Sequence, residues 1–358
     1  MATTAFGVNH PLAVKLWSKT LYHEMLKDTL AYQLMGDNSD AVVQVKGDLS
    51  KDAGDTLHVG LRVQLSGAGV ANDDTLEGQE EAMNFYRDSI VLAQLRHAVR
   101  SEGKMSEQRV PYSMREEAML GLKDWWQDRV DTAILNQLSG NTGQTDTKYT
   151  GGNATLAPTS TAAGGARHIF GVTETTENSL SASASGSNNF QLTLLDKAVT
   201  IAKTVSPYIR PARFNGKQRY ICILHPYQVH SLKTDATANR ITWYDIHRAK
   251  LQGGDTNESG IFARALGEYN GVVLLEDSRV PLAPSTTTVR RAIFCGAQSA
   301  ALVTGKGYAG QKMSWVEDKF DYGNQLGVSA GMIFGVKKLQ INGSDLASIV
   351  ISTHAEAP

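Results

Sequence analysis

A glycine-rich hexapeptide has the spacing of a dinucleotide-binding loop: Gly305-Lys-Gly-Tyr-Ala-Gly310. In a dinucleotide site, this loop must lead into a helix whose N-terminal amide groups hold the pyrophosphate. Here the chain continues as Gln-Lys-Met-Ser-Trp-Val, which is typical of a strand. A P-loop is also excluded, because Gly follows the lysine in place of Ser or Thr and no glycine stands five residues before Gly305. We therefore interpret the motif as a turn within a sheet.

Histidines and cysteines are the next candidates for chemistry. His225, His230 and His247 do not have the His-Glu-x-x-His spacing that places two metal ligands on one helix face. Cys222 and Cys295 each stand in an apolar, strand-like run, which favours buried free thiols and assembly in a reducing compartment. No Gly-x-Ser-x-Gly elbow is present. The sequence thus predicts no metal ligand and no nucleophile.

Clustered carboxylates and paired tryptophans complete the set. The carboxylates could supply a general acid and base, but solvated or helix-start carboxylates are the simpler interpretation. They are Glu77, Glu80, Glu81, Glu317, Asp318 and Asp321. Adjacent helix residues point about 100° apart, so we expect one of Trp125 and Trp126 in the core and the other on a shoulder or a partner. We predict no catalytic residue and no cofactor.

Composition excludes several classes of protein. The 358 residues carry 35 basic and 36 acidic side chains, a net charge of -1, without the basic excess of a protein that grips nucleic acid. A near-neutral chain remains compatible with lining a container for nucleic acid. No apolar run reaches membrane-spanning length, and the N-terminus lacks the layout of a signal peptide. We expect neither a membrane protein nor a secreted one.

The N-terminal third predicts an arm followed by a β-ribbon. Helical pieces are expected over 12–17 and 21–35, with Gly36 ending the second. Apolar and polar residues then alternate, which predicts a strand. Together with Val43 and Val45, this strand is expected to form a long hairpin over 41–78 that needs cover from its own domain or from a neighbour. Its apolar positions are Leu57, Val59, Leu61, Val63 and Leu65.

A long helix is the firmest element in the middle of the chain. Residues 87–100 suggest an extended strand, although a helix is also compatible with the pattern. Over 113–138 apolar residues recur every four positions after a Ser113–Glu116 capping box, and Gly140 is placed to end this helix. Residues 141–189 are rich in Ser, Thr and Gly, so we expect an inserted surface loop.

The C-terminal half predicts an α/β region and then an antiparallel sheet, which makes the chain α+β overall. The expected helices and strands of the α/β region are 192–205, 219–224, a helix from 225–226, 243–251 and 272–276. The expected strands of the sheet are 292–295, 300–303, 312–316, 327–336 and 347–352.

This order of elements, together with local strings over nearly the whole chain, resembles the N-four-like phage major capsid family. Only 141–189 departs from the family pattern. The strings are Val8-Asn-His-Pro-Leu-Ala-Val-Lys-Leu-Trp-Ser18, Leu76-Glu-Gly-Gln-Glu-Glu81, Leu95-Arg-His-Ala-Val99, His225-Pro-Tyr-Gln-Val-His-Ser-Leu-Lys233, Leu266-Gly-Glu-Tyr-Asn-Gly-Val-Val273, Phe294-Cys-Gly-Ala-Gln-Ser-Ala300, Asp321-Tyr-Gly-Asn324 and Gly335-Val-Lys-Lys338.

The resemblance implies the Hong Kong phage-type capsid fold, with an N-terminal arm, an extended E-loop, a peripheral P-domain built on a spine helix, and an axial A-domain. The implied division is arm 1–40, E-loop 41–84, P-domain 85–190 with spine helix 113–138 and insertion 141–189, A-domain 191–285, and returning P-domain sheet 286–358.

The implied function is self-assembly into the icosahedral head shell around double-stranded DNA, held without sequence specificity. Expected partners are other copies in hexamers and pentamers, a portal protein, a separate scaffolding protein and a decoration protein, with assembly in the bacterial cytoplasm. Two alternatives are an encapsulin-like compartment shell and a soluble enzyme. The residues expected to contact neighbouring subunits are Leu12, Trp17, Leu57, Val59, Leu61, Val63 and Leu65.

Overall fold

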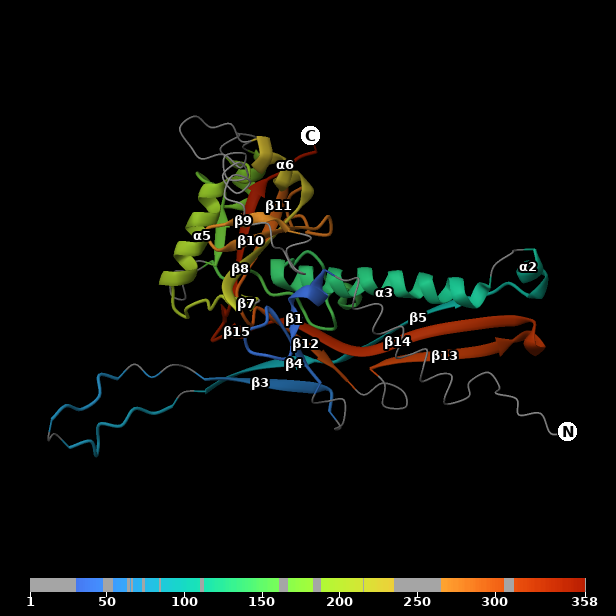
Figure 1. Ribbon diagram of the computed structural model, residues 1–358, viewed down its shortest axis with the longest axis horizontal. Helices are drawn as coiled ribbons and strands as arrows, with labels where there is room; N and C mark the ends of the chain where they lie inside the picture. The colour runs from blue at the N-terminus through green and yellow to red at the C-terminus, as the bar shows by residue number, and fades with distance from the viewer. Residues whose placement is uncertain are drawn as a thin grey trace.

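The computed structural model describes residues 30–47, 54–62, 65, 67–72, 75–83, 85–109, 113–160, 167–182, 188–214, 216–234, 265–305 and 312–357, with only the backbone at Ala31, Leu61, Arg62 and Ala265. Figure 1 shows an elongated subunit. A long helix lies along one sheet, a second sheet with its helices stands at one end of that helix, and a two-stranded arm projects from the same end.

The long helix α3 (Met114–Ser139) forms the spine of the subunit. Its apolar positions four residues apart, including Leu122, Trp126 and Val130, are fully buried on one face. It ends where Gly140 adopts the left-handed conformation, φ 62° and ψ 44°. The predicted helix is confirmed, but the predicted capping box is wrong: the Ser113 side chain makes no cap hydrogen bond, and its backbone carbonyl accepts from Glu116 and Glu117 instead.

A six-stranded sheet packs against α3. Its central strand β14 alternates, so that Val328, Ala330, Met332 and Phe334 face the helix and join one core with it. Trp126 meets Phe334 edge to face at 6.1 Å. The strand order is β1 (Met35–Gly36), β2 (Val43–Lys46), β12 (Ala300–Thr304), β14 (Gln325–Lys338) and β13 (Met313–Phe320), with β5 (Ala93–Arg100) on the other side of β14.

A seven-stranded mixed sheet forms the second part. Its buried strands β8 and β10 run parallel, and helix α5 packs its apolar face on this sheet through Leu195, Ala198 and Val199. The order is β6 (His168–Phe170), β17 (Ser348–His354), β11 (Val289–Cys295), β8 (Lys217–Leu224), β10 (Val272–Glu276) and β9 (Ala265–Tyr269), with β7 (Ala212–Phe214) beside β8. Its helices are α5 (Leu192–Thr204) and α6 (Pro226–Thr234).

Short elements join these layers. They are η1 (Ala31–Leu34), α2 (Lys104–Gln108), η3 (Thr147–Tyr149), α4 (Glu177–Ala182), η8 (Asp321–Gly323) and the hairpin of β15 (Gln340–Ile341) and β16 (Ser344–Asp345). The expected helix 21–35 is wrong at its end, because 31–34 form a 3-10 turn and Met35 starts a strand. The expected helices 12–17 and 243–251 lie outside the described residues.

The predicted hairpin over 41–78 is wrong in its pairing. Strand β2 lies between β1 and β12 in the six-stranded sheet, with Val43 fully buried. Strand β3 (Thr56–Arg62) pairs instead with β4 (Phe85–Val91), in the register Leu57 to Ile90. Alternation identifies a strand but not its partner, so the sequence could not distinguish the two arrangements. The extended reading of 87–100 is confirmed by β4 and β5.

The expectation of a surface loop over 141–189 is wrong in part, since the described residues include exposed ones, such as Lys148 and Val172, but also buried ones. Ile169 is buried in β6, which pairs in parallel with β17. Gln137 of α3 donates to the carbonyls of Thr150 and Asn153, both buried. Polar composition suggested exposure, but here buried polar groups find partners in distant elements.

The strands after residue 289 are confirmed individually, but they do not form one sheet. Strands β12, β13 and β14 belong to the sheet under α3, whereas β11 and β17 belong to the seven-stranded sheet. The chain therefore passes between the two sheets after β11 and again before β17.

Candidate assembly surfaces

The base of the β3–β4 arm is fastened to its own subunit. Leu57 and Val59 are half-buried against a cluster that includes Ile90 and Val303. Buried Asp88 of β4 binds the Lys337 ammonium and accepts from the Gln340 amide at 3.0 Å. These contacts set the direction in which the arm leaves the body.

The rest of the arm carries uncovered apolar side chains. Phe85 is 64% exposed and Leu76 is 61% exposed. The arm projects away from both sheets in Figure 1, so no described part of the subunit covers it. Clustered exposed apolar side chains mark a surface that is covered in an assembly. The arm cluster consists of Leu65, Leu76, Met83, Phe85 and Tyr86.

A second exposed cluster lies at the opposite end of the subunit, at the turn between β13 and β14 (Figure 1). Tyr322 is fully exposed, with Phe320 and Met105 also exposed. Asp321 and Tyr322 both adopt left-handed conformations, φ 51° and 49°, which are unfavourable for residues other than glycine. The Asn324 side chain braces this turn by accepting from the Lys104 amide at 3.3 Å. We call Met105, Phe320 and Tyr322 the tip cluster.

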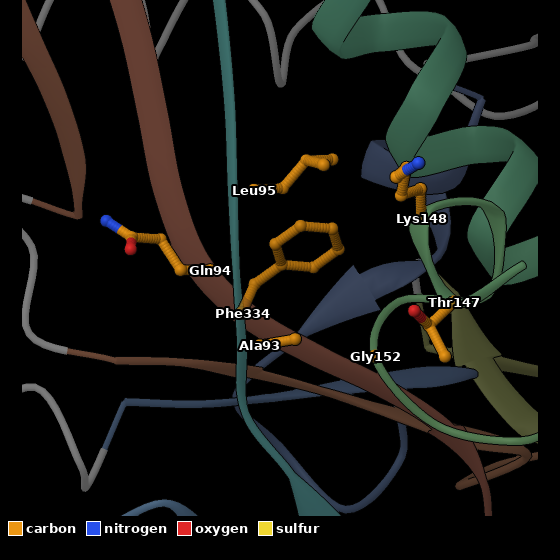
Figure 2. Close-up of a pocket in the computed structure, with 7 residues that line it drawn as sticks. All are labelled: Ala93, Gln94, Leu95, Thr147, Lys148, Gly152 and Phe334. Atoms are coloured by element: carbon orange, nitrogen blue, oxygen red, sulfur yellow. The ribbon is translucent and has the colours of Figure 1, made fainter.

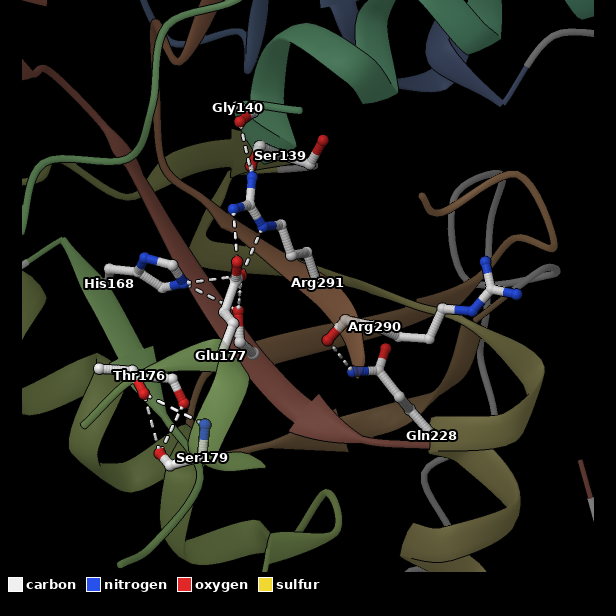
Figure 3. Close-up of polar contacts among 10 residues, drawn as sticks. Ser139, Gly140, His168, Thr176, Glu177, Ser179, Gln228, Arg290 and Arg291 are labelled. Atoms are coloured by element: carbon white, nitrogen blue, oxygen red, sulfur yellow. Dashed lines mark hydrogen bonds and ion pairs between the residues drawn. The ribbon is translucent and has the colours of Figure 1, made fainter. Parts of the chain in front are cut away.

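A buried polar network joins the end of α3 to the seven-stranded sheet (Figure 3). Arg291 of β11 binds Glu177 of α4 through Nε at 2.6 Å and Nη2 at 2.8 Å. Its Nη1 donates to the carbonyls of Ser139 and Gly140, at 3.2 and 2.6 Å, where the helix dipole favours a cation. His168 lies 3.4 Å from Glu177. The network fixes how α3 meets the second sheet.

Arg279 supports the same joint, whereas Lys338 forms a buried ion pair elsewhere, between β14 and β16. Arg279 lies between Asp131 of α3 and Asp277, at 2.7 Å from each. Asp131 also accepts from the Leu30 amide at 3.1 Å, which anchors the start of the described chain on α3. Lys338 pairs with Asp345 at 2.8 Å, and both side chains are essentially buried.

The network predicts a loss of stability in acid. Burial alone raises the pKa of Glu177, but hydrogen bonds from His168 and Arg291 and the charge of Arg291 lower it to about 2. Burial lowers the pKa of His168. Both groups therefore bind protons more readily after unfolding, so stability falls as the pH drops below 6.5, and falls further from 4.5 towards 2.

Glu177 contributes about 3 kcal/mol to the free energy of unfolding at neutral pH, because its pKa is about 2 in the folded chain and each pKa unit corresponds to about 1.4 kcal/mol. Urea unfolding of unassembled subunits between pH 7 and pH 3 measures it. In the variant Glu177→Gln, the free energy of unfolding should no longer fall steeply below pH 4.5. The same fall in the variant as in the native chain would contradict this account.

A small cavity opens where β5 meets the loop around η3 (Figure 2). Its volume is about 50 Å³. Leu95 and Phe334 point into it, whereas Gln94 points to the other side of the strand. Ligand pockets usually measure roughly 300–1,000 Å³, so this cavity has room for part of one side chain only. It is lined by Ala93, Leu95, Phe334, Thr147, Lys148 and Gly152.

Cys222, Cys295 and His225, the candidates for chemistry in the sequence, are buried. No group of three His, Cys, Asp or Glu residues in the described part of the chain could hold a metal, and no described helix is long and apolar enough to cross a membrane. Cys222 and Cys295 are fully buried free thiols, and burial raises the pKa of Cys295 to about 12. Burial lowers the pKa of His225 to about 4. These groups belong to the core.

The structure tests two sequence expectations about individual side chains. Trp126 is fully buried and Trp125 stacks on His97 at 4.4 Å, as expected for a core and a shoulder residue. The expectation of a solvated Glu317 is wrong, since this residue is buried and accepts from Arg115 and Trp315 at 2.7 Å.

The residues predicted to contact neighbouring subunits lie in different environments. Leu12, Trp17 and Val63 lie outside the described residues, and Leu61 is described only in its backbone. Leu57 and Val59 pack at the arm base, and Leu65 is exposed on the arm. Sequence reasoning missed Leu76, Met83, Phe85 and the tip cluster. The aromatic pair Phe85-Tyr86 next to a run of carboxylates was a signal that could have found the arm.

Comparisons with known proteins agree with this geometry. The major capsid protein of Pseudomonas phage KPP25 is 27% identical over 350 residues, covering 91% of this chain and 89% of that protein. The capsid of Ralstonia phage GP4 matches with a TM-score of 0.78 and 29% identity, over 100% of this chain and 99% of that one. The cyanophage Pam1 capsid matches with a TM-score of 0.70 at 19% identity, over 92% and 93% of the two chains.

These structural matches confirm the α+β, Hong Kong phage-type capsid fold. The family model described as phage capsid protein matches residues 5–357. With nearly the whole sequence covered, the chain belongs to the phage capsid protein family.

Proposed function

We propose that copies of this chain join into the head shell through the arm cluster and the tip cluster. The chain is a phage major capsid protein, and such proteins form a homo-oligomeric shell. The observation that carries the proposal is the arm itself: Phe85 and Leu76 are mostly exposed on a ribbon that leaves the body. An isolated two-stranded ribbon is marginally stable in water, so cover by a neighbour would stabilise it.

The finer assignments are part of this proposal. We assign hexamers and pentamers of an icosahedral shell around double-stranded DNA, assembled in the bacterial cytoplasm with a portal, a separate scaffolding protein and a decoration protein. The near-neutral charge supports a wall that does not hold DNA tightly. We also propose the division into arm, E-loop, P-domain and A-domain, with α3 and the six-stranded sheet as the P-domain, the seven-stranded sheet as the A-domain and the β3–β4 ribbon as the E-loop. The family match favours a phage shell over an encapsulin-like compartment or an enzyme.

Electron microscopy of the expressed protein tests the proposal. We expect closed shells, tubes or capsomer rings, either from the protein alone or when it is coexpressed with the scaffolding protein of its phage. A uniform monomer under both conditions would contradict the proposal and favour an enzyme.

A further inference from the structure

Among the described residues, strand β5 pairs only with β14, so it leaves one edge of the six-stranded sheet open. Its odd-numbered residues bond to β14, because the adjoining Ser101 amide donates to Leu326 at 2.8 Å and hydrogen-bonded pairs alternate along an antiparallel ladder. The backbone groups of Gln94, Arg96, Ala98 and Arg100 therefore face away from β14. They make no backbone hydrogen bond with the described residues. An exposed edge of this kind is a template for another strand.

The two faces of this edge differ in chemistry. On the α3 side, Leu95 points into the cavity of about 50 Å³ beside Phe334. On the opposite face, Arg96 and Arg100 are exposed, with Ala98 between them. Arg96 forms no ion pair with the described residues, whereas Arg100 lies 4.3 Å over the Phe320 ring and donates to the Gln325 side chain. The edge thus has an apolar cavity on one face and two arginine side chains on the other.

The chain itself carries a segment with matching chemistry on the arm, residues 79–83, with the sequence Gln-Glu-Glu-Ala-Met. These residues are exposed, and neither Glu80, Ala82 nor Met83 makes a backbone–backbone hydrogen bond with the described residues. In Figure 1 the arm and the free part of β5 extend towards opposite ends of the subunit, so the arm cannot reach its own β5 edge. The occupant must come from a second copy.

We propose that residues 79–83 of one subunit add as an antiparallel strand to the β5 edge of another. With Met83 opposite Leu95, its side chain enters the cavity. Glu80 then lies opposite Ala98, on the face that carries Arg96 and Arg100, and exchanges its bond to the Gly78 amide for these cations. A parallel strand anchored at the same cavity would place Glu80 opposite Leu92, before β5 begins. The antiparallel register alone satisfies both faces.

Disulfide trapping tests the register. Hydrogen-bonded antiparallel partners lie about 5.5 Å apart at Cα, within the roughly 4.4–6.8 Å range of disulfides. The variant Glu80→Cys with Ala98→Cys should form covalent multimers on mild oxidation of assembled shells, while the native cysteines stay buried and unreactive. Thr75→Cys with Ala98→Cys, five residues out of register, is the matched control. Shells that form without cross-links at 80 and 98 would overturn the proposal.

Charge reversal provides a second test of the pairing that does not depend on cysteines. We expect Glu80→Arg or Arg96→Glu to lower shell yield by at least about tenfold, because like charges would then face each other. The two changes combined should restore assembly. Arg213→Glu, at another exposed arginine, is the control. Failure of the combined variant to recover, with both singles impaired, would overturn the pairing.

This inference rests on the proposed role of the arm, and the two can fail separately. If Phe85→Asp with Leu76→Asp leaves shells intact, the arm proposal itself is wrong. That variant could instead block assembly while the single charge reversals leave shell yield unchanged and the Glu80→Cys with Ala98→Cys pair gives no cross-link. In that case only the β5 docking is wrong.

Discussion

Replacing Phe85 and Leu76 together by aspartate should abolish shell formation while the subunit stays folded. Both side chains are more than 60% exposed, so the substitutions remove little packing within the subunit. In an assembled shell they would place two carboxylates where apolar surface is buried, and burial of an unpaired charge costs several kcal/mol each. Because every subunit repeats the contact, the defect is multiplied around the shell.

Sucrose-gradient sedimentation and negative-stain microscopy measure the loss of shells, and circular dichroism with urea unfolding checks the fold. Val172→Asp, at another exposed apolar position, is the matched control and should assemble. Substitutions at Leu57 or Val59 are less suitable, because these half-buried residues hold the arm base and their loss would unfold it. Normal shells from the double variant would remove the arm from the assembly mechanism.

Replacing Arg291 by alanine should have the largest effect on folding stability. Arg291 is 4% exposed, and its guanidinium binds Glu177 together with the carbonyls of Ser139 and Gly140. Its removal leaves the partly buried Glu177 carboxylate without its main cation and two helix-end carbonyls without this donor. Breaking one side of a buried pair costs about 3–5 kcal/mol. We therefore expect the free energy of unfolding to fall by about that amount.

The measurement is best made on the Phe85 and Leu76 double variant, since assembly would otherwise add its own stabilisation. Arg219→Ala is the control, because Arg219 and Glu268 form a more exposed pair, worth about 1 kcal/mol or less. A loss below 1 kcal/mol for Arg291→Ala would mean that the network does not hold α3 to the second sheet. In shells, we expect the variant to lower yield because the angle between the two sheets is no longer fixed.

The sequence by itself predicted the local elements well. The four-residue spacing of Leu122, Trp126 and Val130, followed by Gly140, located α3 to within a residue. Apolar runs located β8, β10 and β14 to within two residues at each end. These patterns succeed because backbone period and turn conformation depend on residues a few positions apart. The family resemblance predicted the fold and the shell-forming role.

Only the tertiary structure decided which strands pair and which polar residues are buried. Alternation in β2 and β3 is the same whether they pair with each other or, as here, with β12 and β4. In the sequence, Glu177 and Arg291 look like surface residues, because they are each other's partners and stand 114 positions apart. The division of the ribbon into a fastened base and an exposed arm was equally hidden. Each of these features depends on contacts between distant segments, and no local period records which distant segment a residue will meet.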